Sequence, residues 1–412
     1  MATHHEPPAT SSSSSPSQPR LTQLPYELVN NIAVFLPRQD FENFRLSSPA
    51  IAACTKPLLA LSHFDGVPWR RDGKRLQDLS LIPSCARRIR SVKFNMSRMV
   101  EEEVEYATSR IINAEELNRA WGPYLVTQDV FHRPVELPLG LVVPALMRLP
   151  NLDTLCLTWT ENPWEDYKDI DLVFNTDESL DLAGDEVLES QQAILDTLHR
   201  RNIPLKSLTL EPIMHPELIM PSTLDEKVST VFGSVTQLHL ALKYEVEAFK
   251  PDRLDYFISL MPNIRDLKVH VWPVGVEASD VDFYLTKRLR HLEKIDLCCL
   301  HIGFVNFARL INDHGPTLKE VRLQSLYGWC DPFKSIDIDW DIMFKLMREK
   351  LEVLETIQIG GRFGDNVGWY QLFLRNDEPA VNTIVRFMGE KSGRLEKYIL
   401  EGGEYPQPLW RI

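Results

Sequence analysis

The sequence predicts an α/β protein in which a short helical module precedes an irregular solenoid of alternating strands and helices. Apolar residues recur at helical spacing over 24–59, which favours three short amphipathic helices. A second pattern, apolar-x-x-apolar-x-apolar, recurs eight times between residues 89 and 359 and is typical of short strands with one apolar face. We expect four parts: a disordered tail over 1–20, the helical module over 21–63, the solenoid over 64–370 and a C-terminal cap over 371–412.

Composition narrows the classes of function. The formal net charge of -13 argues against nucleic-acid binding, which requires a basic face. No stretch approaches the roughly 20 apolar residues that span a bilayer, and the start of the chain lacks the pattern of a secretory signal. The six cysteines form no Cys-x-x-Cys pair, so neither a zinc site nor a disulfide framework is indicated. We expect a cytoplasmic and/or nuclear protein with no membrane partner and no nucleic-acid partner. The first 20 residues are rich in serine and proline and lack apolar anchors, which favours disorder.

The helical module begins at Pro25, which suits the first position of a helix because its missing N–H costs nothing there. An apolar stripe follows at helical spacing and ends before Pro37; it consists of Leu28, Ile32, Phe35 and Leu36. A second apolar set follows Asp40 and consists of Phe41, Phe44 and Leu46. Ser48 and Pro49 then open a third helix as N-cap and first position. A module below about 40 residues rarely stabilises its own core. We therefore expect contacts with a partner or with the following domain to stabilise it.

This module resembles an F-box. The resemblance rests on Leu24-Pro25-Tyr26-Glu27-Leu28, Ile32, Leu36-Pro37, Asp40-Phe41 and Phe44-Arg45-Leu46-Ser47, and covers about a tenth of the chain. It implies docking on the Skp-type adaptor of a cullin ubiquitin ligase. The residues that it implies for the adaptor site, or for the core or edge of the module, are Leu24, Pro25, Leu28, Ile32, Leu36, Phe41 and Leu46. The sequence departs from the family at Ser48-Pro49, where many members carry a basic or aromatic residue. An ordinary helical cap on a larger domain is the alternative.

The repeated strand motif begins at residues 89, 152, 205, 235, 264, 292, 318 and 354. From 205 to 318 the intervals are 30, 29, 28 and 26 residues, close to the leucine-rich-repeat period of about 20–29. Helical patterns separate the strands over Val187–Leu198, Leu254–Leu260, Phe304–Ile311 and Ile342–Leu351. Several motifs also share a turn-like lead-in, as in Leu149-Pro150-Asn151-Leu152 and Met261-Pro262-Asn263-Ile264.

This array resembles the degenerate leucine-rich repeats that follow the F-box in many fungal-type F-box proteins, although the asparagine that usually closes the core motif is missing. The resemblance implies a substrate-recognition subunit of an SCF-type ubiquitin ligase. A (β/α)₈ barrel is the rival architecture. A barrel's parallel strands are buried on both faces and are apolar throughout, whereas positions such as Lys268, Asp296 and Arg322 are polar here. An open solenoid is therefore favoured.

No motif assembles a catalytic or metal site. Asp337, Asp339 and Asp341 lack the glycine and glutamate that a calcium loop requires. The glycine run 360–364 lacks a following Lys-Ser/Thr pair and is interpreted as a flexible turn after the last strand. Strand alternation is expected to place one thiol of Cys298-Cys299 in the core and the other outside. We expect no enzymatic activity, no cofactor and no metal.

The polar strand positions are the candidate binding surface for an unknown protein substrate. They are Asp266, Lys268, His270, Lys294, Asp296, Glu320, Arg322 and Gln324. Trp159, Trp272 and Trp329 follow strand ends and are candidate anchors, though packing in the core suits them equally. The alternative for the polar positions is the solvated side of the sheet. The alternative function is a leucine-rich-repeat scaffold or protein-binding module that acts without ubiquitin transfer.

Overall fold

The structure is a computed structural model of the whole chain. It describes residues 24–25, 28–29, 32–33, 43–55, 62–67, 71–99, 137–160, 180–181, 184–213, 231–243, 251–272, 283–329, 339–364, 369–372 and 394–405. The chain divides into two compact units, Met1–Leu61 and Ser62–Ile412, and each is described by itself. The predicted tail over 1–20 lies outside the described residues, and the predicted domain boundaries stay predictions.

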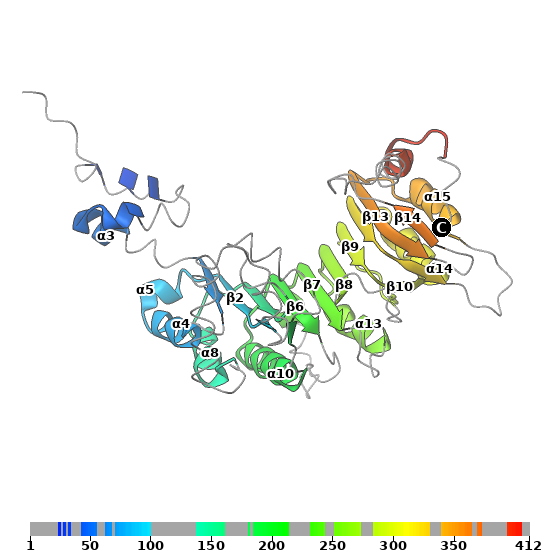
Figure 1. Cartoon of the computed structure of the whole chain (residues 1–412). Coiled ribbons are helices and arrows are strands. Elements are labelled where there is room, and N and C mark those ends of the chain that lie inside the picture. Colours follow the sequence, from blue (N-terminus) through cyan, green and yellow to red (C-terminus); the bar gives the residue numbers. More distant parts are fainter. Residues whose placement is uncertain are drawn as a thin grey trace, which may run out of the picture. The chain divides into compact units, whose positions relative to one another are not determined.

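The larger unit is a mixed α/β structure built on an open, mainly parallel sheet whose main strands follow one another in chain order (Figure 1). The second and third apolar residues of every predicted motif lie on one parallel strand, and the first precedes that strand by two residues. These strands are β2 (Ser91–Asn95), β4 (Thr154–Thr158), β6 (Ser207–Ile213), β7 (Gln237–Lys243), β8 (Asp266–Trp272), β9 (Lys294–Cys298), β11 (Glu320–Gln324) and β13 (Thr356–Gly364). A further strand, β1 (His63–Gly66), pairs with β2 and was not predicted; it starts at the last residue of the predicted helical module.

Helices connect the strands, as the periodicity predicted. They are α4 (Asp72–Ser80), α5 (Pro83–Ala86), α8 (Leu139–Leu146), α10 (Gly184–Arg201), α13 (Pro251–Ser259), α14 (Phe304–His314) and α15 (Trp340–Lys350). All four predicted helical segments fall on α10, α13, α14 and α15. Helices α8, α10 and α13 lie along the same side of the sheet (Figure 1). In this part of the sheet the strands are parallel and the helices between them cover one of its two sides (Figure 1).

The core is formed by the apolar positions of the motif. Strand register places the second apolar residue of each motif in one continuous row, and no member is more than 5% exposed: Val92, Leu155, Leu208, Leu238, Leu267, Ile295, Val321 and Ile357. Full burial of such a side chain stabilises the fold by about 1.5–3 kcal/mol. A shift of one residue in any strand would turn its members to the other face, so this row fixes the register of the whole sheet.

A line of left-handed residues crosses the last three repeats. Cys299, Ser325 and Gly361 have φ values of 56°, 51° and 80°, and each follows directly on a residue of one register row. The chain then starts a second short parallel ladder, made of β10 (His301–Gly303), β12 (Tyr327–Trp329) and the end of β13, with β14 (Trp369–Leu372) antiparallel to β13. The prediction of a flexible turn over 360–364 is therefore wrong. This segment belongs to β13, which pairs with β12 on one side and with β14 on the other.

The remaining elements are small. A two-residue antiparallel pair joins β3 (Arg98–Met99) to β5 (Leu180–Asp181). Near the C-terminus, residues 394–401 are helical, and Leu395 and Ile399 are buried there. Glu396 Oε1 accepts a hydrogen bond from Ile359 N at 3.0 Å, which ties this helix to β13. In the smaller unit the backbone is helical at 28–29, 32–33 and 43–46 and in α3 (Pro49–Thr55).

Candidate functional site

The eight residues predicted as a binding surface come together on three adjacent strands, β8, β9 and β11. Register aligns Asp266 with Lys294 and Glu320 in one row, and Lys268 with Asp296 and Arg322 in the next; His270 and Gln324 flank Cys298 in a third. Lys294 is exposed and the other seven are half-buried. We call these eight residues the polar face. Their assembly is what a stack of parallel repeats produces from polar residues at equivalent strand positions.

Opposite charges balance on the polar face. Lys294 Nζ lies 2.5 Å from Glu320 Oε2, and His239 Nε2, on the neighbouring β7, lies 3.9 Å from Asp266 Oδ1. In the next row burial raises the pKa of Asp296, which the nearby Arg322 and Lys268 counteract. With His270 neutral, the polar face carries three carboxylates and three cationic side chains. It therefore suits a partner surface with charges of both signs, and not a uniformly charged ligand.

Two buried nitrogens on the polar face have no hydrogen-bond partner within the described part of the chain. These are His270 Nδ1 and Arg322 Nε. Burial, and to a lesser extent the charge of Lys268, lowers the pKa of His270 to about 4, so the imidazole is neutral at pH 7. Unsatisfied buried polar atoms cost free energy unless a partner supplies hydrogen bonds. Each nitrogen has less than 1 Å² of accessible area, so a bound protein segment could reach it only after neighbouring side chains move.

The three tryptophans predicted as candidate anchors differ in burial. Trp159 is only 2% exposed and belongs to the hydrophobic core, so its interpretation as an anchor is wrong. Trp329 lies on β12 and is half-buried, while the side chain of Trp272 lies outside the described residues. The sequence could not separate these cases because a tryptophan at a strand end suits core and surface equally.

The vicinal cysteines are both buried, so the prediction that one thiol lies outside is wrong. The left-handed backbone at Cys299 breaks the alternation of the strand and turns both side chains inward. Their Sγ atoms lie 3.6 Å apart. The hydrogen bond to Cys299 and burial raise the pKa of Cys298, so its thiol stays protonated at neutral pH. A protonated, buried thiol is a poor nucleophile and a poor metal ligand.

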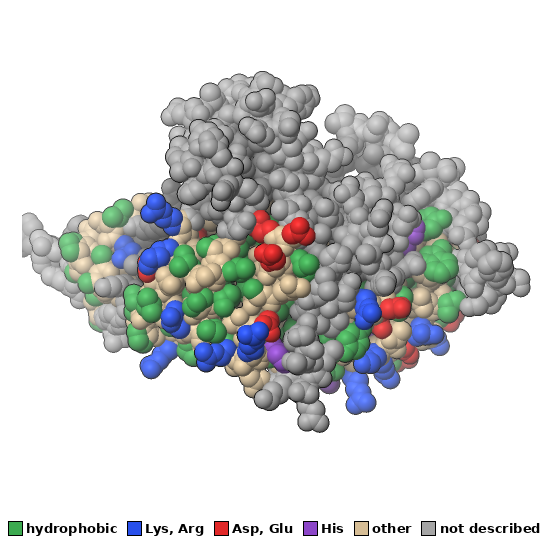
Figure 2. Space-filling model, turned by 90° about the horizontal axis from the view of Figure 1, so that it is seen from below, with side chains coloured by type: hydrophobic (Ala, Val, Ile, Leu, Met, Phe, Trp, Pro, Cys, Tyr) green, Lys and Arg blue, Asp and Glu red, His purple; other side chains and the backbone are tan. Residues whose placement is uncertain are grey.

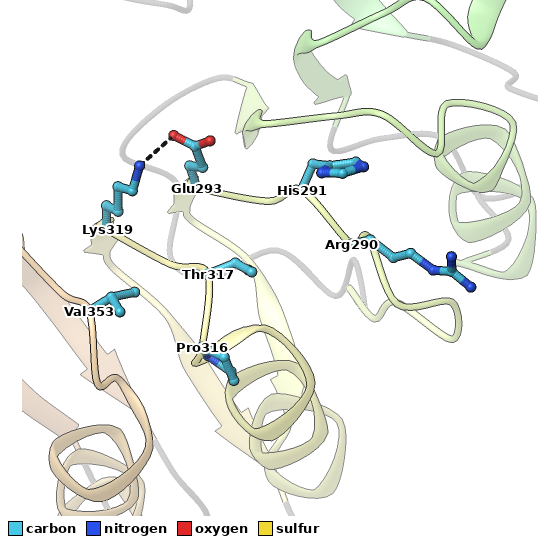
Figure 3. A pocket seen from close by; sticks show the side chains of 7 residues that line it. All are labelled: Arg290, His291, Glu293, Pro316, Thr317, Lys319 and Val353. Carbon is cyan, nitrogen blue, oxygen red and sulfur yellow. Dashed lines mark hydrogen bonds and ion pairs between the residues drawn. The ribbon is translucent and has the colours of Figure 1, made fainter.

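Sequence reasoning missed a pocket at the edge where the strands begin. It is open, has a volume of about 240 Å³ and lies between the loops that precede β9, β11 and β13 (Figure 3). Its lining residues are Arg290, His291, Glu293, Pro316, Thr317, Lys319 and Val353. Glu293 receives Arg265 Nη1 at 3.3 Å on Oε1 and Lys319 Nζ at 3.1 Å on Oε2. The hydrogen bond from Lys319 lowers the pKa of Glu293, so the carboxylate stays ionised.

The repeats around the pocket lack an asparagine bridge that two other repeats have. Asn151 Nδ2 donates to the carbonyl oxygen of Arg87 at 2.6 Å, and Asn263 Nδ2 donates to that of Gly233 at 2.6 Å. Each asparagine directly precedes its motif and reaches the preceding repeat. In the last three repeats this position holds His291, Thr317 and Val353, all of which line the pocket. The Pro-Asn lead-ins were visible in the sequence, but their bridging role required the structure.

The residues predicted to bind an adaptor are described in part. Leu28 and Ile32 are 48% and 39% exposed, and Leu46 is 84% exposed, whereas the adjacent Val29 and Ala33 are buried. The amides of Leu28 and Val29 donate to the carbonyl oxygen of Pro25, as expected for a proline that opens a helical turn. Leu24 is half-buried and Pro25 is exposed. Leu36 and Phe41 lie outside the described residues.

No family model matches the chain, and no curated protein matches it. Among solved structures, the chain is similar to the leucine-rich repeat-containing protein LegL7 from Legionella pneumophila, with 11% identity over 84% of this chain and 100% of that one, at a TM-score of 0.24. A likeness at this level carries no argument about function. Among the described residues, no group of His, Cys, Asp and Glu could hold a metal ion, and no helix is long and apolar enough to cross a bilayer.

Proposed function

We propose that this chain is a substrate-receptor subunit of an SCF-type cullin ubiquitin ligase. In this role the F-box-like segment binds a Skp-type adaptor, and the polar face of the repeats binds a protein substrate. The observation that carries the proposal is the division of apolar residues in the first helical segment. Val29 and Ala33 are buried, while Leu28 and Ile32 are exposed. Exposed apolar side chains at helical spacing favour a site that a partner covers.

The chain's contribution to ubiquitin transfer is positional in this proposal. The adaptor holds one end of the receptor, and the substrate on the polar face is brought near the charged enzyme of the complex. Proximity alone raises the rate of a bimolecular transfer, so no catalytic side chain and no cofactor are needed from this chain. The mixed charges of the polar face support specificity more than affinity, as is usual for charged groups at protein interfaces.

Co-purification with a Skp-type adaptor tests the proposal. The full chain is expected to bind the adaptor, and the double variant Leu28→Asp, Ile32→Asp is expected to lose binding because two carboxylates would be buried against the partner. The matched control is Val305→Asp, Ile342→Asp, which changes two comparably exposed apolar residues on α14 and α15. This control is expected to bind like the unmodified chain. Absence of binding by a folded, unmodified chain would refute the receptor role.

A protein-binding scaffold without ubiquitin transfer is the second candidate. It is favoured by the location of the polar face, all of whose residues lie in the larger unit and none in the F-box-like segment. Loss of the protein separates the two roles, because only a ligase receptor predicts accumulation of the bound target. Unchanged target levels, with target binding intact, would favour the scaffold.

A further inference from the structure

The loops that lead into the parallel strands are strongly basic, although the whole chain carries a net charge of -13. The described residues nearest the strands, which include the helix ends Arg201 and Lys350, contain twelve lysines and arginines against four aspartates and glutamates; the residues counted are 81–90, 147–153, 201–206, 233–236, 260–265, 283–293, 314–319 and 350–355. Backbone hydrogen bonds join successive loops at the residue before each strand, for example Glu293 N to Arg265 O at 2.8 Å and Lys319 N to Glu293 O at 2.7 Å. The topology therefore collects these charges along one edge of the sheet, which we call the basic edge.

The positive charge is densest in 283–293, the described part of the connection before β9; Glu277, Asp280 and Asp282 precede it in the sequence. Lys287, Arg288 and Arg290 lie within four residues there and are all exposed. Lys287 Nζ donates to Ser259 Oγ at 3.2 Å. No ion pair within 4.0 Å joins Arg288 or Arg290 to any carboxylate of the described chain. Like charges placed this closely repel one another, and a negative partner would relieve that repulsion.

The pocket beside this loop is lined on one side by Pro316 and Val353, and within it Lys319 points toward Glu293 (Figure 3). The Arg290 side chain extends away from these residues, so its charge is presented outside the pocket (Figure 3). We propose that the basic edge docks an acidic segment of a partner protein, whose carboxylates lie against Arg288 and Arg290.

The arrangement favours a protein over a nucleic acid. At the position directly before each strand the residues are Arg90, Asp153, Lys206, Thr236, Arg265, Glu293, Lys319 and Glu355. Neighbouring strands are about 4.8 Å apart, so a phosphate backbone lying along this edge would meet repeated carboxylates. A protein segment can place uncharged residues opposite them and carboxylates opposite the basic positions. Figure 2 shows lysine and arginine side chains gathered along the lower margin of the visible face, with acidic side chains among them. The inference does not depend on adaptor binding or on the polar face.

Fluorescence anisotropy with the full chain tests the inference, using as probe a labelled peptide of alternating Glu and Ser. The variant Arg288→Glu, Arg290→Glu is expected to bind it at least about tenfold more weakly, with a loss that shrinks at high salt. The matched control Lys74→Glu, Lys397→Glu makes the same change in net charge at two exposed lysines elsewhere and is expected to bind within about twofold of the unmodified chain. The peptide with Gln in place of Glu is expected not to bind.

A second pair of variants separates ligand binding from a structural role. Glu293→Gln and Lys319→Gln break the same ion pair, so a purely structural role predicts shifts in the same direction. Docking of a carboxylate predicts opposite shifts: tighter binding for Glu293→Gln, weaker binding for Lys319→Gln. Shifts of one sign would overturn the inference, as would equal losses in the charge-reversal variant and its control. It would also fail if single-stranded DNA of equal charge bound more tightly than the peptide. Adaptor co-purification of the same variants reports on the receptor role separately.

Discussion

Asn151 and Asn263 make the same hydrogen bond in two different repeats. Each directly precedes its strand motif, and each donates from Nδ2 to a backbone carbonyl two residues before the preceding motif, at 2.6 Å in both cases. This hydrogen bond links neighbouring repeats outside the hydrophobic core, at the edge where the strands begin.

Substitution of either bridging asparagine is expected to weaken the stack. Asn151→Ala and Asn263→Ala each remove one hydrogen bond between repeats, and each is expected to lower the free energy of unfolding by about 0.5–1.5 kcal/mol. Urea denaturation followed by circular dichroism measures the change. Asn312→Ala is the control, because its Nδ2 bonds the carbonyl of Ala308 within α14 and alanine favours a helix. If Asn312→Ala lowered the free energy of unfolding as much as the two bridging variants, the bridging role of Asn151 and Asn263 would be contradicted.

Gly361 is expected to tolerate no side chain. Its φ is 80°, and an added Cβ would lie 2.1 Å from Ser325 Oγ. Gly361→Ala is therefore expected to lower the free energy of unfolding by about 1–3 kcal/mol. Ser325→Gly relieves a left-handed non-glycine residue and removes the clashing oxygen. Combining it with Gly361→Ala should recover part of the loss in a thermal or urea melt; complete additivity of the two changes would argue against the clash.

Buried histidines are expected to make the fold sensitive to mild acid. Burial lowers the pKa values of His314 and His270 below the ordinary value of 6.5. The pKa of His270 falls to about 4. The unfolded chain therefore binds more protons than the folded chain between those values, and stability must fall as the pH drops below about 6.5. In the folded state His314 Nε2 accepts from Leu289 N at 3.0 Å, a bond that requires the unprotonated nitrogen.

Urea midpoints at pH values from about 7 to 5 measure this dependence, since most carboxylates titrate lower. His314→Gln and His270→Gln are each expected to flatten the pH dependence, whatever they do to stability at pH 7. Groups near His314 include Asp313, which raises its pKa, and Arg288, which lowers it. A slope unchanged by both substitutions would show that other groups take up the protons.

Trp340 is expected to be the largest single contributor to the packing of the last repeats. Its ring centroid lies 4.9 Å from that of Phe363 and 5.3 Å from that of Phe304, which joins α15 to β13 and α14. Trp340→Ala is expected to lower the free energy of unfolding by about 3–5 kcal/mol, and Trp340→Phe by less. Tyr256→Ala, at a partly exposed aromatic of α13, is the control and should cost far less in the same urea titration.

The repeat architecture was predictable because the core imposes it on the sequence. Each motif needs apolar residues at fixed spacing to fill the same row, so Leu208, Leu238 and Leu267 could be aligned before their strands were seen. The polar face followed for the same reason, since Lys268, Asp296 and Arg322 occupy equivalent positions between the apolar ones. Periodicity is visible in a sequence whenever burial selects one face of an element.

Features set by local backbone or by contacts between repeats were not predictable. The left-handed turn at Cys299 leaves no mark in hydrophobic spacing, so both the inward thiols and the second ladder of β10 and β12 were missed. The pocket was missed because it arises where an asparagine is replaced by His291, Thr317 and Val353, three residues with no shared chemistry. Trp159 could not be assigned to the core or to the surface from the sequence, because a tryptophan after a strand end suits both, and the structure buries it.

Strand register in this sheet is independent of how much chain separates the strands. Motif starts are 63 residues apart between 89 and 152 but only 26 apart between 292 and 318, and the apolar rows align in both cases. The entropic cost of closing a loop rises only slowly with its length. A strand that slipped by one residue would instead expose its whole core face. The connecting segments can thus lengthen, shorten or change in composition over evolutionary time while the stacked framework stays in place.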